Sequence, residues 1–202
     1  RQMCIRDRGN TILANRALKG YLFGKGADGL HFTNGTATLS NNIIAEHPDT
    51  GLYAESSTMD LSHTTLVGNE LRVDDSQLIM TNTIVVSATV GITVQEGSAI
   101  MEATLWGSGR WANDTDWGGG GTLVTGTHNY WGDPAFIAPE FGDYHIGAGS
   151  AAIDRGIDAG ISTDIDGEAR PQGCGFDIGA DEFITEAECK RLHLPLILRS
   201  RP

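Results

Sequence analysis

A repeat of about twenty residues in the first half of the chain constrains its fold more than any other feature. One apolar column has steps of 22, 19 and 21 residues and consists of Leu30, Leu52, Leu71 and Ile92. A second column shares the first two of these steps and consists of Leu39, Leu61 and Met80. Two columns in one register predict structural units that stack along an axis and bury their apolar residues in a common core.

Each repeat unit has the composition of short β-strands joined by bends. Its β-branched runs are broken by small polar residues, and no stretch is long enough for an amphipathic helix. Strands this short become stable when each coil hydrogen-bonds to the next at a spacing of about 4.8 Å. We therefore expect an all-β parallel β-helix, with Asn42, Thr64 and Thr83 at its bends or in polar ladders along the stack.

Two other folds with short strands fit the sequence less well. A leucine-rich repeat would show several leucines and an asparagine in the spacing LxxLxLxxN, which the units lack. A β-sandwich would explain the short strands but not the constant step.

The charge of the chain excludes one class of partner. Lys and Arg number 14 against 26 Asp and Glu, and the net charge of −12 argues against binding to nucleic acid, which requires clustered cations. The sequence also lacks an apolar run of the roughly 20 residues that a membrane-spanning helix needs.

The second half of the chain carries five motifs in a fixed order: GDPAF, GDYHI, GSAAIDRG, TDIDGEARP and DIGADE. With these motifs, the segment from Trp106 onward resembles the C-terminal portion of choice-of-anchor Q domain bacterial surface proteins, from which Ala151 and Asp181 depart mildly. Residues 9–106 resemble the right-handed parallel β-helix family with the pectate-lyase-like fold. The two resemblances imply a right-handed parallel β-helix with a C-terminal capping module, secreted or displayed on a bacterial cell surface.

These features divide the chain into four parts. Residues 1–8 contain MCIRDR, which resembles a translated sequencing adapter and is left out of the fold assignment, and the natural protein is expected to begin upstream. Residues 9–134 are assigned to β-helix coils. Residues 135–184 are assigned to a capping module that covers the unpaired strand edges at the end of the coils. Residues 185–202 form a basic and apolar tail, either a sorting or surface-attachment signal or one last strand.

The stretch from Thr163 to Phe183 is the densest in ionisable groups, and calcium is one ligand to consider for it. Asp164, Asp166 and Gly167 fit positions of a calcium loop, but Gly173 stands where a bidentate Glu is required. A looser calcium site at Asp164 and Asp166, completed by backbone carbonyls, remains a hypothesis. The sequence indicates no other cofactor.

A structural clasp accounts for more of the same residues. Asp side chains bond nearby backbone N–H groups in turns, and Arg170 offers a guanidinium that can pair with Asp154, Asp166 or Asp177. Cys174 and Cys189 either form a disulfide, as a secreted protein allows, or are two unpaired small residues.

Catalytic constellations are sparse in this sequence. Asp74 and Asp75 form an acidic pair, but the partner motifs that a polysaccharide hydrolase would place on neighbouring coils are missing. Lys25, Arg72 and Arg110 are the only candidate bases for a lyase, and none lies beside an acidic cluster. We therefore assign no catalytic residue.

Four tryptophans suggest a binding role instead. Trp111 and Trp117 lie in a Gly-rich segment that interrupts the repeat, where exposed indoles would stack on sugar rings while Asn113, Asp114 and Asp116 bond hydroxyls. In the alternative, Trp106 and Trp131 pack into the last coil and Trp117 pins the loop.

The sequence thus predicts an extracellular β-helix protein that binds or presents carbohydrate and is attached to the cell envelope. The alternatives are a fragment of a polysaccharide lyase or glycoside hydrolase whose active coils lie upstream, and a structural stalk.

Overall fold

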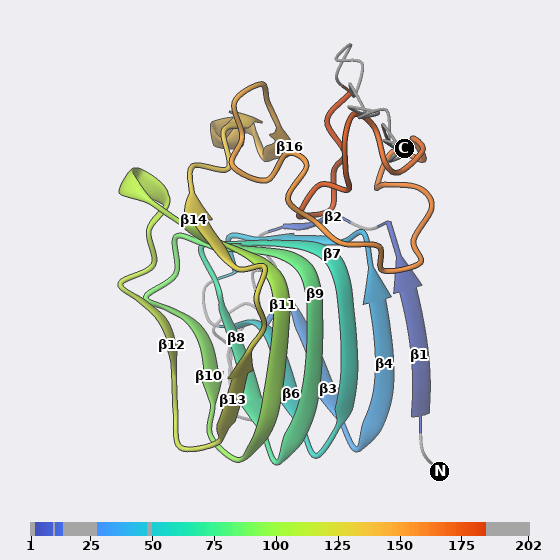
Figure 1. Ribbon diagram of the computed structural model, residues 1–202. Helices are drawn as coiled ribbons and strands as arrows, with labels where there is room; N and C mark the ends of the chain where they lie inside the picture. Colours follow the sequence, from blue (N-terminus) through green and yellow to red (C-terminus); the bar gives the residue numbers. More distant parts are fainter. Residues whose placement is uncertain (1–2, 10, 14–27, 48–49, 185–202) are drawn as a thin grey trace, which may run out of the picture.

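The computed structural model describes residues 3–9, 11–13, 28–47 and 50–184, and the coils it contains form a parallel β-solenoid of about five turns (Figure 1). The strands within these residues are β1 (Met3–Arg8), β2 (Thr11–Leu13), β3 (Leu30–Thr33), β4 (Gly35–Ser40), β5 (Ile43–Ala45), β6 (Thr50–Glu55), β7 (Thr58–Val67), β8 (Glu70–Asp74), β9 (Ser76–Val86), β10 (Val90–Val94), β11 (Gly97–Gly107), β12 (Thr115–Gly118), β13 (Thr122–Thr125), β14 (Tyr130–Gly132), β15 (Phe136–Ala138) and β16 (Asp143–Ile146). Two short 3₁₀ turns are η1 (Gly109–Trp111) and η2 (Pro139–Phe141).

Turns of the solenoid contribute one strand each to a smaller parallel sheet and one long strand or two short strands each to a larger one. Among the described residues, the smaller sheet has five strands in the order β12-β10-β8-β6-β3, and the larger sheet runs from β1 through β4, β7, β9 and β11 to β13. Strand β1, from the segment left out of the fold assignment, pairs with β4 in parallel. The prediction of stacked parallel coils is confirmed.

The apolar columns expected from the sequence form the inner core of the solenoid. Leu30, Leu52, Leu71 and Ile92 are Cα partners on successive strands of the smaller sheet. Leu39, Leu61 and Met80 are partners on the larger sheet, and all three are fully buried. The two predicted columns therefore face each other across the interior.

Left-handed backbone conformations mark three corners in the coils that end with β5, β7 and β9. The first corner has Asn34, Ser56 and Asp75, the second has Asn41, His63, Asn82 and Ala103, and the third has Glu46, Gly68 and Ser87. Asn tolerates this conformation because its short polar side chain bonds locally. Of the residues expected at bends or in ladders, Thr64 and Thr83 are buried ladder partners just after the second corner, and Asn42 holds the same place in its coil.

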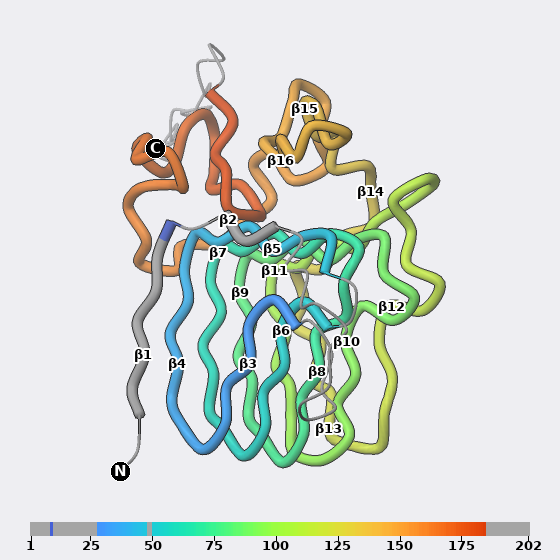
Figure 2. The backbone as a smooth tube through the Cα atoms, turned by 180° about the vertical axis from the view of Figure 1, so that it is seen from behind, coloured from blue at the N-terminus to red at the C-terminus, as the bar shows by residue number. Residues whose placement is uncertain are grey.

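The C-terminal region lies along the flank of the solenoid, beside the second corner. In Figures 1 and 2 the orange and red segments run across several coils and leave β12 and β13 uncovered. A second core joins the flank to this region, and its largest members are Ile43, Val67, Ile84, Leu105, Trp111, Phe136, Tyr144, Ile146 and Ile178. The capping role assigned to residues 135–184 stays a prediction, and within the described residues β12 and β13 are the last strands of their sheets along the main strand order.

Polar bonds fix the C-terminal region to the corner residues. Asn41 Nδ2 donates to Thr163 O at 2.6 Å. Asn82 Nδ2 donates to Ile157 O at 2.7 Å, and Asn82 Oδ1 accepts from Ile157 N at 2.9 Å. These side chains use the amide groups that the corners direct outward, so the region docks without adding a strand to the solenoid.

No helix in the described ranges has the length and apolarity required to cross a membrane.

Candidate functional site

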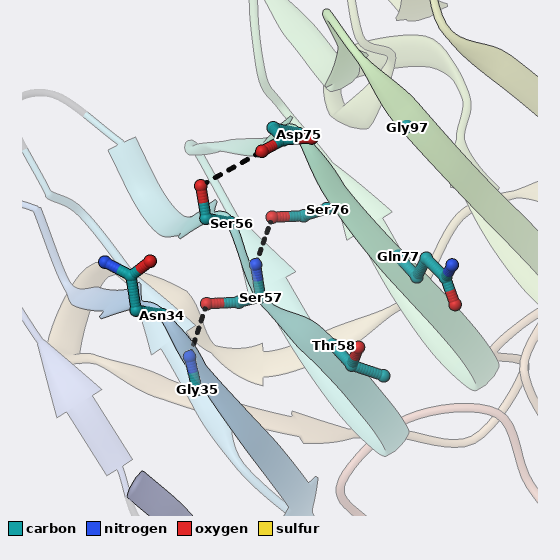
Figure 3. Close-up of a pocket in the computed structure, with 9 residues that line it drawn as sticks. All are labelled: Asn34, Gly35, Ser56, Ser57, Thr58, Asp75, Ser76, Gln77 and Gly97. Carbon is teal, nitrogen blue, oxygen red and sulfur yellow. Dashed lines mark hydrogen bonds between the residues drawn. The ribbon is translucent and has the colours of Figure 1, made fainter. Parts of the chain in front are cut away.

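A shallow polar trough runs along the first corner of the solenoid (Figure 3). Its volume is about 580 Å³, and its lining consists of Asn34, Gly35, Ser56, Ser57, Thr58, Asp75, Ser76, Gln77 and Gly97. Successive coils contribute equivalent residues, so the trough follows the axis. Glycine is required at position 97, where a Cβ would overlap the backbone of Ser76.

The serines of the trough make hydrogen bonds within the protein, whereas two exposed amide side chains can bind a ligand. Ser76 Oγ accepts from Ser57 N at 2.9 Å and donates to Asp74 O at 2.7 Å. Ser56 Oγ donates to Asp75 Oδ2 at 3.1 Å. Asn34 and Gln77, both exposed, make no side-chain hydrogen bond within the described residues. The trough thus offers amide groups to a ligand but no aromatic face.

A second candidate surface lies on the terminal coil and is aromatic. Trp117 is the register partner of Ile92, and Trp131 is the partner of the buried Trp106. Both therefore occupy inward positions of a coil that no further described strand covers. Trp117 is 36% exposed with its ring centroid 5.3 Å from that of Trp106, and Trp131 is 56% exposed.

A chain of hydrogen bonds holds the orientation of Trp131. Its Nε1 donates to Asp116 Oδ2 at 2.8 Å, while Asp116 Oδ1 accepts from Asn113 Nδ2 at 3.0 Å. Asn113 is anchored in turn, because its Oδ1 accepts from Ala88 N and its Nδ2 donates to Val85 O. The exposed indole face of Trp131 is thereby fixed before any ligand arrives.

The structure places the residues that the sequence suggested for ligand binding in different environments. Trp111 is only 8% exposed and packs edge-on against Phe136 at 5.0 Å, so the expectation of an exposed indole there is wrong. Asn113 is committed to backbone groups, and Asp114 is exposed. The alternative placement is also only partly met, since Trp106 is buried but Trp131 is not.

The acidic stretch forms a buried clasp around Arg170. Arg170 Nη1 donates to Glu182 Oε2 at 2.6 Å, and both side chains are fully buried. Arg170 Nη2 donates to Gly179 O and Ala180 O at 2.9 and 2.7 Å. The partner is thus Glu182, whereas Asp154, Asp166 and Asp177 were expected, and the carboxylates of Asp154 and Asp177 make other bonds.

Carboxylates in this region take the place of a β-ladder as partners of backbone N–H groups. Asp177 accepts from Asp154 N and Phe183 N, and Asp154 Oδ1 accepts from Cys174 N and Gly175 N. Burial raises the pKa of Asp177 to about 7, against the effect of these bonds. The density of acids is explained by a fold with few strands, whose amides would otherwise lack acceptors.

The two residues considered for calcium have different roles. Asp164 is buried, and its oxygens accept from Asp166 N, Glu168 N and Glu182 N. Asp166 is exposed and lies beside His145, with Oδ2 2.9 Å from Nε2. The backbone bonds thus hold Asp164 in its turn.

The structure also bears on the Asp74–Asp75 pair and on Cys174. Asp74 and Asp75 do not act as a pair, because Asp74 accepts from Tyr53 Oη while Asp75 lines the trough. Cys174 is disulfide-bonded, whereas Cys189 and the rest of the tail lie outside the described residues.

The sequence carries one signal that this flank of the solenoid is covered. The runs at Ile43–Ala45, Leu66–Val67 and Ile84–Val86 are apolar without alternation, which is typical of strands covered on both faces. Trp131 gave no such signal, since its register with Trp106 follows a longer loop than the repeat predicts.

Comparisons with known proteins find no counterpart: the chain matches no protein-family model, no curated protein and no solved structure.

Proposed function

We propose that this chain belongs to an extracellular or cell-surface protein that binds carbohydrate through the aromatic surface of its terminal coil. The surface consists of Trp117, Trp131 and Asp116, whose carboxylate accepts from Trp131 Nε1. The observation that carries the proposal is the exposed indole of Trp131, held in place by Asp116. Large apolar side chains at the surface, fixed by polar neighbours, favour a ligand with both apolar and hydroxyl-bearing faces.

Sugar rings have this combination of faces. Their C–H faces stack on indoles, and their hydroxyls donate to carboxylates such as that of the exposed Asp114. Trp117 also covers Trp106, so the same side chains close the end of the core and present an outer face. The two roles are compatible because a stacked sugar contacts only the solvent side.

The location of the protein outside the cell or on its surface is part of the same proposal. Support comes from the motifs that resemble choice-of-anchor Q domain proteins, from the pectate-lyase-like character of the coils, and from the disulfide at Cys174, which is typical of an oxidising environment. Attachment to the cell envelope is assigned to the tail at residues 185–202.

The test is a glycan array followed by titration of the best ligand against matched variants. We expect Trp131→Ala and Trp117→Ala each to weaken binding about 10-fold, the equivalent of about 1.4 kcal/mol. Val124→Ala, on the same coil but on the outer face of β13, is the control and should bind as the wild type does.

Other outcomes of this titration distinguish the alternatives. Binding that survives both Trp changes but is lost in Asn34→Ala with Gln77→Ala would assign the ligand to the trough. A stalk would bind no glycan at all. A lyase or hydrolase fragment would bind only a substrate that a longer chain with its upstream coils cleaves.

A further inference from the structure

We propose that His145, Asp166 and Asp181 form a site for a divalent transition-metal ion, with zinc as the ion that the ligand set fits best. The three side chains come from β16, from the turn after Asp164 and from the segment before Glu182. One ligand atom from each lies within 4.8 Å of the others. No other group of three such side chains is found in the described ranges.

Metal binding requires the tautomer of His145 in which Nδ1 carries the proton and Nε2 presents its lone pair. Nδ1 lies 2.6 Å from Asp143 Oδ1, and because a carboxylate only accepts, Nδ1 carries the proton. Nε2 is buried and has no hydrogen-bond partner among the described residues, although Asp166 Oδ2 is 2.9 Å away. Histidines that bind metal ions usually donate the N–H of the other ring nitrogen to a carboxylate, which fixes the ring, and Asp143 is in position to do this.

Asp181 supplies a fixed and buried charge on the other side. Its side chain belongs to a residue only 8% exposed, and Oδ2 accepts from Ile146 N at 2.8 Å. The buried cation of the region, Arg170, is engaged by Glu182. A metal ion would compensate the charge of Asp181 and Asp166 at the point where their oxygens and Nε2 converge.

The ligand types select the class of ion. Calcium takes oxygen ligands, whereas an imidazole nitrogen with two carboxylates suits zinc and its neighbours. Zinc bonds of about 2.0–2.1 Å place ligand atoms about 3.4 Å apart, so the 2.9 Å between His145 Nε2 and Asp166 Oδ2 must widen slightly. Asp166 can make this movement because its side chain is 55% exposed.

The competing account is that His145 is a doubly protonated imidazolium that pairs with the carboxylates and binds no metal. Calorimetric titration of the full chain with zinc chloride at neutral pH separates the two accounts. We expect one bound zinc ion and an increase of the melting temperature. His145→Gln and Asp166→Asn should each weaken binding at least 10-fold, and Asp143→Asn about 10-fold.

A second histidine serves as the matched control. His128 lies 2.8 Å from Glu102 but has no second carboxylate in a three-residue group, so His128→Gln should leave zinc binding unchanged. The proposal is overturned if zinc does not bind, if it binds equally to Asp166→Asn, or if calcium binds and zinc does not. Because Asp166 is exposed, its variant keeps the test valid even if His145→Gln fails to fold.

Discussion

The solenoid presents two surfaces that could recruit further chain, and the structure covers only one of them. The flank beside the second corner is apolar and packed under the C-terminal region, whereas the terminal coil keeps its strand edges and its tryptophans exposed. The covering region adds no strand to the larger sheet and holds to the corners through side-chain amides. The difference indicates that this region holds the coils together along the axis, while no described strand lies beyond β12 and β13.

The strongest test of the covered flank is Arg170→Ala. The change removes a buried cation and leaves Glu182 buried without its partner, so we expect a loss of about 3–5 kcal/mol in the free energy of unfolding. Urea denaturation followed by circular dichroism measures this loss. Arg110→Ala, which removes only an exposed guanidinium 4.8 Å from the Trp111 ring, should cost about 1 kcal/mol or less. Equal losses in both variants would contradict the clasp.

The corner amides can be tested with a pair of matched glycine variants. Asn82→Gly keeps the left-handed backbone but removes the bonds to Ile157, and we expect a loss of about 2–3 kcal/mol because each buried hydrogen bond contributes about 1 kcal/mol. Asn34→Gly makes the same change at an exposed corner of the trough and should cost under about 1 kcal/mol. If the C-terminal region docks through the corner amides, urea denaturation must show a larger loss for Asn82→Gly than for Asn34→Gly.

The pH dependence of stability should report on His63, which lies under the C-terminal region. Burial and the nearby Arg170 lower its pKa to about 3, so the folded protein keeps it neutral while the unfolded chain, with a pKa near 6.5, takes up a proton. This contribution is complete above pH 6.5 and is lost as pH falls toward 3, by up to about 1.4 kcal/mol per pH unit. His63→Asn, with the residue found at positions 41 and 82, should lose less stability between pH 7 and 4.5. Identical slopes in the two proteins would rule out the neutral buried imidazole.

The smallest effect is expected at the uncovered coil. Trp131→Ala should change the free energy of unfolding by about 1 kcal/mol or less, because the indole is more than half exposed. Its register partner Trp106 is buried, and Trp106→Ala should cost about 3–5 kcal/mol. Differential scanning calorimetry of the two variants checks this difference. Equal losses would mean that Trp131 contributes to the core as much as Trp106 does.

The interior of the solenoid could be predicted from the sequence because its contacts repeat. Leu52 has an equivalent one coil away in each direction, so a regular step in the sequence corresponds to a contact in space. The position of the C-terminal region could not be predicted this way. Its bonds join residues such as Asn82 and Ile157, which are 75 positions apart and occur once.

The candidate sites show the same limit. The sequence predicts Arg170 at the centre of a clasp because an Arg among acids must find partners, but which acid pairs with it depends on the path of the backbone. The burial of Trp111 follows from its edge-on contact with Phe136, and the exposure of Trp131 follows from its place on the terminal coil. No local pattern encodes either.

The spacing of the corners has a consequence for how such a chain can change. The segments Asn34–Asn41, Ser56–His63 and Asp75–Asn82 have equal lengths, and so do Asn41–Glu46, His63–Gly68 and Asn82–Ser87. In these three coils the variation in length therefore falls between the third corner and the next first corner. This edge of the three coils can accept insertions or deletions over evolutionary time, and an engineer could graft an epitope there, while their other two sides keep their alignment.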